Sequence, residues 1–193
     1  PTYALYGETG AHVAGGFAHI ETIAARSALH DWEIAPHRHD DFVQVLLVRD
    51  GHVLLTLDGT ERSLDGPCRV IAPPRMVHGF RFRHGTSGYV LTLSTDFAAR
   101  ATGPADGLLA ALAQGGAGTM DARPATRAFW LAEEMLELQR EWREHDPLFL
   151  ALAEALVRTL TRADGDGQAG ALADRRLHRF RQLVELHYRE HRP

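Results

Sequence analysis

Residues 36–51 read PHRHDDFVQVLLVRDG, and this stretch decides how the first half of the chain folds. Phe42–Arg49 is an apolar, partly β-branched run, typical of a buried strand, and the Asp50-Gly51 pair after it is a turn former. His37 and His39 stand two residues apart, so on extended chain both side chains project to one face. The stretch therefore predicts a strand preceded by two histidines that point the same way.

Short β-rich segments surround this strand up to about residue 96, separated by turn-forming residues. The Asp58-Gly59 pair, followed by the strand-like Glu61–Leu64, predicts a hairpin. Many short strands without intervening helices predict an antiparallel sandwich or barrel. The predicted strands are Ala18–Ile23, Asp31–Ile34, Phe42–Arg49, Val53–Leu57, Cys68–Ala72, Val77–Phe82 and Tyr89–Thr95.

After residue 103 the apolar period changes to 3.6, which predicts helices. The predicted helices are Pro104–Gln114, Thr126–Arg143, Pro147–Arg162 and Ala173–Arg189. The sequence ADGDGQAG at 163–170 is glycine-rich and is interpreted as a linker. We therefore expect a barrel over residues 1–100, a helical segment over 101–163 and the start of a second, truncated unit over 171–193.

Composition and charge restrict the class of protein. The 193 residues are 45% hydrophobic and 24% charged, as in a folded globular protein without a membrane span. The chain begins at Pro1, so we expect it to be part of a longer protein, and its lone Cys68 favours the reducing cytoplasm. Residues 1–174 carry 15 arginines against 23 acidic residues (net −8), whereas 175–193 carry 6 against 2 (net +4). Only the end of the chain is therefore suited to nucleic acid.

A second motif, Pro73-Pro74-Arg75-Met76-Val77-His78, leads into a strand on which His78, Phe80 and Phe82 share a face. Together with the first stretch it resembles the cupin pattern, in which His-x-His, a glutamate and a later histidine converge inside a small β-barrel. The resemblance implies a mainly β fold with added helices, a cupin-type antiparallel barrel (a double-stranded β-helix). It places His37, His39, Gln44 and His78 at the four ligand positions.

The departures from the cupin pattern bear on metal binding. Gln44 replaces the usual glutamate, Arg75 a glycine and Phe82 an asparagine. His37, His39, Gln44 and His78 could hold Zn²⁺, Fe²⁺ or Ni²⁺, but the amide of Gln44 brings no charge, so we expect less than about half an equivalent of metal. The alternative is a pocket whose polar residues bind an organic ligand. The remaining histidines are interpreted as surface or satisfied polar residues.

The barrel, the striped helices and a basic stretch RRLHRFR at 175–181 together resemble AraC-type transcription regulators, in which a cupin sensor precedes two helix-turn-helix units. The segments at 24–34, 77–82 and 89–93 are similar to regulators that respond to p-hydroxybenzoate. The resemblance implies an effector-sensing domain, no enzyme activity, and DNA binding only through a segment that is absent here. The alternative is a metal-dependent cupin enzyme, a dioxygenase or isomerase, for which the helices after the barrel have no need.

A hydroxylated aromatic acid such as 4-hydroxybenzoate needs apolar walls, a cation and polar groups. Arg75 is the candidate partner for its carboxylate and the cupin positions for its hydroxyl, whereas Arg81 and Arg83 are expected in solvent. The candidate walls are Phe80, Phe82, Phe42 and Trp32. The resemblance also implies a homodimer through the stripe of Thr126–Arg143, although core packing explains that stripe as well. The candidate interface residues are Leu131, Met135, Leu138 and Trp142.

Overall fold

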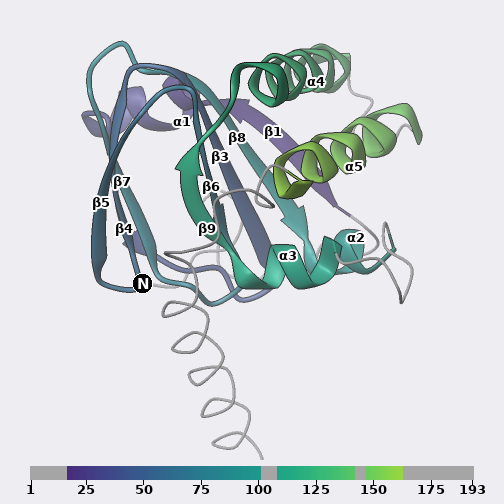
Figure 1. The fold of residues 1–193 in the computed structure, drawn as a ribbon, viewed down its shortest axis with the longest axis horizontal. Helices are drawn as coiled ribbons and strands as arrows, with labels where there is room; N and C mark the ends of the chain where they lie inside the picture. Colours follow the sequence, from purple (N-terminus) through teal and green to yellow (C-terminus); the bar gives the residue numbers. More distant parts are fainter. Residues whose placement is uncertain (1–16, 101–107, 142–146, 163–193) are drawn as a thin grey trace, which may run out of the picture. The chain divides into compact units, whose positions relative to one another are not determined.

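The computed structural model describes residues 17–100, 108–141 and 147–162, and in these ranges a β-barrel is followed by helices (Figure 1). The predicted Ala173–Arg189 helix lies outside the described residues. The strands are β1 (Ala18–Thr22), β2 (Glu33–His37), β3 (Phe42–Asp50), β4 (His52–Leu57), β5 (Thr60–Asp65), β6 (Cys68–Ala72), β7 (His78–Phe82), β8 (Ser87–Ser94) and β9 (Gly116–Thr119). The helices are α1 (Ile23–Ser27), the 3-10 turn η2 (Ala28–His30), α2 (Thr95–Arg100), α3 (Leu108–Gln114), α4 (Ala122–Arg140) and α5 (Pro147–Arg162).

The strands form two antiparallel sheets that face each other. The five-stranded sheet has the order β1-β8-β3-β6-β9, and the four-stranded sheet has the order β2-β7-β4-β5. Every strand pair within them is antiparallel. This arrangement confirms the cupin-type barrel, followed by helices, that the sequence predicted.

Strand β3 is central to the five-stranded sheet, and its two faces lie in two different cores. Leu46 and Val48 point into the barrel, where they pack with Phe80 and Phe82 of β7. The alternate side chains, Val45 and Leu47 among them, belong to the core between this sheet and the helices. A strand covered on both faces is apolar throughout, which explains the unbroken run in the sequence. Because faces alternate, Gln44 shares the inner face with Leu46.

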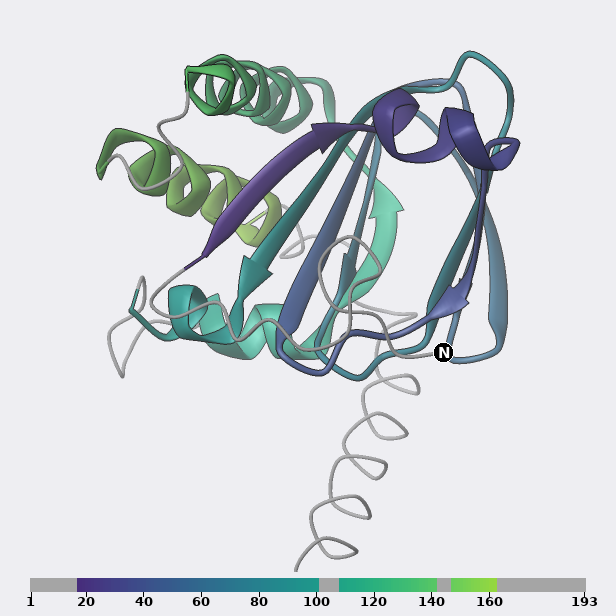
Figure 2. The same cartoon turned by 180° about the vertical axis from the view of Figure 1, so that it is seen from behind.

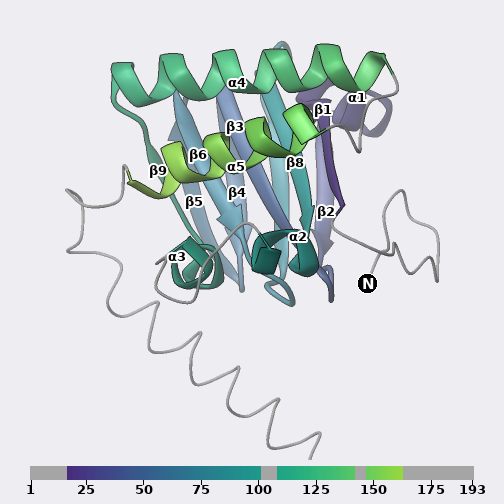
Figure 3. The same ribbon diagram turned by 90° about the vertical axis from the view of Figure 1, so that its right-hand side faces the viewer.

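Helices α4 and α5 cover the outer face of the five-stranded sheet and cross over its strands, while α2 and α3 lie at one end (Figure 3). Two polar contacts tie α4 to the sheet. Arg49 of β3 contacts Glu133 at 2.5 Å. The Gln139 side chain accepts from the backbone N–H of Ile20 at 2.8 Å and donates to the carbonyl of the same residue at 2.6 Å. Since β1 is an edge strand, Gln139 takes the place of a neighbouring strand there.

Several predicted boundaries were wrong for local reasons. Helix α4 starts at Ala122, four residues before the predicted start, because Pro124 lies in the first turn, where its missing N–H breaks no helical hydrogen bond. Strand β9, with the sequence GAGT, was missed because glycine-rich chain carries no β pattern, and it pairs with β6. Ile23 begins α1 rather than ending a strand, with Thr22 as its N-cap.

Gly88 at the start of β8 has the backbone requirement that only glycine meets. Its φ is +150°, and a Cβ there would lie 1.9 Å from the carbonyl oxygen of Leu47 on β3. The close approach of β8 to β3 therefore needs glycine at this position. No helix within the described residues is long and apolar enough to cross a membrane.

Candidate functional site

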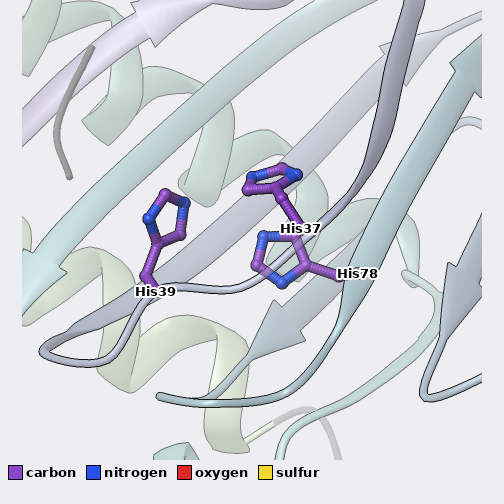
Figure 4. A group of neighbouring side chains, drawn as sticks. All are labelled: His37, His39 and His78. Atoms are coloured by element: carbon purple, nitrogen blue, oxygen red, sulfur yellow. The ribbon is translucent and has the colours of Figure 1, made fainter. Parts of the chain in front are cut away.

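Three buried histidines converge inside the barrel (Figure 4). His37 at the end of β2 is the register partner of His78 at the start of β7, and His39 follows β2 by two residues. The ring centroid of His37 lies 4.9 Å from that of His39 and 4.5 Å from that of His78. Each ring offers a nitrogen that lies within 4.8 Å of the other two. The chain thus assembles from two strands the histidine cluster that the spacing predicted.

Local hydrogen bonds set which ring nitrogen faces the interior. Nδ1 of His37 lies 2.9 Å from the carbonyl oxygen of Ala35, and Nδ1 of His78 lies 2.9 Å from that of Met76. A carbonyl oxygen only accepts, so in each ring Nδ1 carries the hydrogen. In the neutral ring Nε2 then keeps its lone pair, which is the tautomer that ligates metals or accepts a hydrogen bond from a ligand.

Burial keeps these rings neutral. Desolvation lowers the pKa of His37 from 6.5 to about 4, against the opposing effect of its bond to Ala35. Desolvation, with a smaller contribution from the nearby His37, lowers the pKa of His78 from 6.5 to about 3. A charged imidazolium loses its hydration in the barrel and gains no carboxylate in exchange among the residues named in these contacts. His37 and His78 are therefore uncharged at neutral pH.

Gln44 joins the cluster through His78, whose Nε2 lies 3.0 Å from Oε1 of Gln44. Because Nδ1 of neutral His78 already donates to Met76, Nε2 must accept, so the Gln44 amide has to present its N–H₂ group there rather than its oxygen. A half-turn of the amide achieves this without changing its shape. Gln44 thus occupies the lone pair that a metal would need on His78.

The structure brings three further candidate residues to the cluster. Phe80 lies 5.7 Å from His78 and Phe42 lies 6.2 Å from His39, measured between ring centroids. Arg75 is half-buried, and its backbone N–H donates to the carbonyl of His39 at 2.7 Å. The φ of Arg75 is +68°, a conformation that favours glycine, the residue usual at this position of the cupin motif. Two aromatic rings and the backbone of Arg75 therefore border the three histidines.

Other candidates lie elsewhere. Phe82 stacks on Phe80 at 5.9 Å, one step further from His78 along β7. Trp32 contacts His84, with ring centroids 5.4 Å apart, rather than the cluster. Arg81 and Arg83 are exposed, as expected, and Arg81 pairs with Glu33.

The sequence analysis missed two polar residues on the interior wall, His19 and Thr92. They are opposite each other in the β1–β8 register, and Thr92 is opposite Gln44 in the β3–β8 register. Directly opposed residues share a face, so His19, Thr92 and Gln44 form a polar row across the sheet. His19 is 8% exposed and Thr92 4%. The alternation of β8, with Thr92 two residues after the inward Val90, was the available signal.

The donor set fits a divalent metal, which His37, His39 and His78 would hold through neutral imidazole nitrogens. Such an ion would supply positive charge and Lewis acidity toward an oxygen of a ligand. Binding requires the amide of Gln44 to give up its hydrogen bond to His78, and Gln44 offers no charge in return. Metal and the present hydrogen-bonded arrangement therefore compete for the same nitrogen.

The predicted interface residues on α4 take part in packing inside one chain. Leu131 is 5% exposed and Met135 is fully buried, both in the core between helices and sheet. Leu138 packs against the same core, while Trp142 lies outside the described residues. The large exposed apolar side chains of α4 and α5 are instead Trp130, 54% exposed, and Leu148, 55% exposed. The homodimer stays a prediction, and these exposed positions are further candidates for its surface.

Comparisons with solved structures found partial matches to this chain. The AraC-like transcriptional activator CuxR is 15% identical over 74% of this chain and 51% of its own, with a TM-score of 0.44. KdgF from Halomonas sp. is 26% identical over 32% of this chain, with a TM-score of 0.30, and this chain spans 56% of the KdgF chain. Oxalate decarboxylase of Bacillus subtilis is 12% identical over 42% of this chain and 25% of its own, with a TM-score of 0.29.

No curated protein matches this chain. The model of a protein family, however, matches residues 17–179, which include the histidine cluster, the barrel and the helices after it. That match covers most of the chain. The protein therefore belongs to the AraC-like ligand binding domain family.

Proposed function

We propose that the barrel binds a small hydroxylated aromatic acid, such as 4-hydroxybenzoate, as the effector of a transcription regulator. The observation that carries this proposal is the neutral histidine cluster next to aromatic walls. The uncharged Nε2 of His37, whose Nδ1 faces the carbonyl of Ala35, suits the hydroxyl of a phenol, which donates a hydrogen bond and needs no counter-charge. The rings of Phe42 and Phe80 lie beside them. The ligand is thus described by its chemistry: a donor, a flat apolar ring and an anion.

The carboxylate of the acid would be met by Arg75, from the loop that enters β7. A guanidinium matches a carboxylate with two parallel hydrogen bonds, and half-burial strengthens the pairing relative to the surface. His19 and Thr92 extend the polar wall and offer further hydrogen bonds to a ring substituent. Binding would favour one arrangement of the domain, and this change would be transmitted to a DNA-binding segment outside the described residues.

An enzyme is the second candidate, because three histidines within 4.8 Å can hold a metal. The regulator is favoured over it by the engagement of Gln44 with His78 and by the lack of a carboxylate at the fourth cupin position. A homodimer would be consistent with a regulator, since a two-fold contact lets the binding of one ligand act on two DNA-binding segments.

The test is a thermal-shift and calorimetric panel at pH 7.5 with chelator present. 4-Hydroxybenzoate should raise the melting temperature by several degrees at saturating concentration, and arabinose or a fatty acid should not. His37→Ala should weaken 4-hydroxybenzoate binding at least tenfold, whereas Arg81→Met, which removes an exposed arginine on the outer surface, should leave it unchanged. A response to arabinose or to a fatty acid, with none to hydroxybenzoates, would overturn the proposal.

A further inference from the structure

A second pocket, of about 380 Å³, lies where β1 passes into α1 and where β8 begins. Figure 2 shows from behind how strand β1 leads directly into helix α1. Its walls include the rings of Trp32 and Tyr89. Of the described residues that line it, Arg49 alone carries a charge. The volume is within the range of small-molecule sites, and the combination of apolar walls with one convergent charge is typical of them. Neither the cupin motif nor the histidine cluster includes this pocket.

The pocket is separate from the histidine cluster. Gln44 and Arg49 are both on β3, five residues apart, which corresponds to about 17 Å along a strand. They also differ in face: Gln44 points into the barrel toward His78, whereas Arg49 lies over the ring of Phe129 on α4. A ligand at Arg49 is therefore not the ligand of the barrel interior.

Arg49 is held in place and still has hydrogens to donate. Its guanidinium carbon lies 4.9 Å from the ring centroid of Phe129 and 5.6 Å from that of Tyr89. Its Nη2 donates to Glu133 at 2.5 Å and to the Tyr89 hydroxyl at 3.4 Å. Within the part of the chain that the structure describes, both hydrogen bonds use Nη2, which leaves Nε and Nη1. A fixed guanidinium with spare N–H groups is the usual partner of a carboxylate.

The hydroxyls of two pocket residues already take part in hydrogen bonds. The Thr22 hydroxyl accepts from the backbone N–H of Ala25, and the Thr86 hydroxyl donates to the carbonyl of Arg83 at 2.7 Å. Because Arg49 carries the positive charge in this lining, an anionic ligand atom is directed to Arg49. The neighbouring Asp50 interacts electrostatically with Arg49, and Glu133 pairs with it, so a second negative charge on the ligand would be repelled. The charges select a monoanion.

We propose that this pocket is a second ligand site, for a small monocarboxylate with a flat apolar body. The carboxylate replaces Glu133 on Arg49, and the apolar body lies against Trp32. Glu133 is 47% exposed, so water replaces its partner at little cost, as for other surface ion pairs. Because Glu133 belongs to α4, ligand binding releases the ion pair between α4 and Arg49 of β3. This site goes beyond the proposed effector site and does not depend on it.

The test measures benzoate binding to the full chain by calorimetry, with benzamide as the uncharged probe of the same shape. Arg49→Met should weaken benzoate binding at this site at least tenfold. Glu133→Gln should strengthen it at least threefold, since the competing carboxylate is gone while Arg49 stays. Arg81→Met is the matched control, because it removes one arginine from the comparable surface pair with Glu33. Benzamide should not bind at this site.

The barrel site and this pocket are told apart by His37→Ala. If both sites exist, Arg49→Met and His37→Ala each remove one of two binding events. Benzoate binding that survives Arg49→Met unchanged, or that does not respond to Glu133→Gln, overturns the second site and leaves the proposed effector site standing. Loss of benzoate binding in Arg49→Met, with none in His37→Ala, supports the second site, and the barrel site is decided by the separate measurement with 4-hydroxybenzoate.

Discussion

Acidification should unfold this protein earlier than a domain without buried histidines, because the cluster must stay neutral in the folded state. The unfolded chain binds protons at His37 and His78 below a pKa of about 6.5, whereas the folded chain resists protonation down to about 4 and about 3. Between these values the unfolded state carries up to two more protons. Stability therefore falls as the pH falls, by up to about 3 kcal/mol per pH unit.

The loss from pH 7 to pH 5 amounts to about 2 kcal/mol for each ring, or about 4 kcal/mol for both, integrated over the titration of the unfolded chain. This is a large share of the 5–15 kcal/mol that is typical of a domain. Above pH 7 the two histidines should contribute almost no pH dependence, since neither state is then protonated.

Urea denaturation at half-unit steps from pH 7.5 to 5, with chelator to exclude metal, measures this dependence. His37→Gln should reduce the slope by about half, because one of the two rings no longer titrates in the unfolded state. His84→Gln, which removes an exposed histidine outside the cluster, is the control for the loss of an imidazole as such. An unfolding free energy that stays constant from pH 7 to pH 5 would refute the neutral, desolvated cluster.

Three further substitutions test the roles of Gln44, Gln139 and Trp130. Gln44→Glu should tighten zinc binding at least tenfold in a chelator competition, since it adds the missing negative charge. An unchanged affinity would show that the fourth cupin position does not limit metal binding. Gln139→Ala should lower the unfolding free energy by about 1–3 kcal/mol in urea, because Ile20 loses both side-chain bonds, and an unaltered midpoint would contradict the role of Gln139 at the sheet edge. Trp130→Glu should shift a homodimer toward monomer in sedimentation without changing the melting temperature of the monomer. Leu131→Glu, by contrast, places a charge in the core and should unfold the chain. Dimers that persist in Trp130→Glu would exclude this surface.

The pattern of residues along the chain was sufficient for the barrel and for the histidines. A strand is recognised in a sequence by alternating apolar and polar residues or by a run of apolar residues. Two histidines that are two residues apart on extended chain share a face whatever lies around them. That is why His37 and His39 were found from sequence, and why the apolar β3 was assigned to the barrel. The same local rules failed at β9, where GAGT forms a strand only because β6 offers it an edge.

Only the tertiary structure decided what the polar residues do. Gln44 bonds to His78, and so competes with a metal, because β3 and β7 face each other across the barrel. The two residues are 34 positions apart in the sequence. Leu131 and Met135 of the α4 stripe are buried in the core between the helices and the sheet. The period of the sequence does not distinguish such a core from a dimer seam. Arg49 shows the same limit: the sequence predicts it as the last residue of a strand, and only the fold places it between Glu133 and a pocket. Periodicity records which face of an element is apolar; which partner covers that face, and which charge meets which, depends on contacts between distant segments.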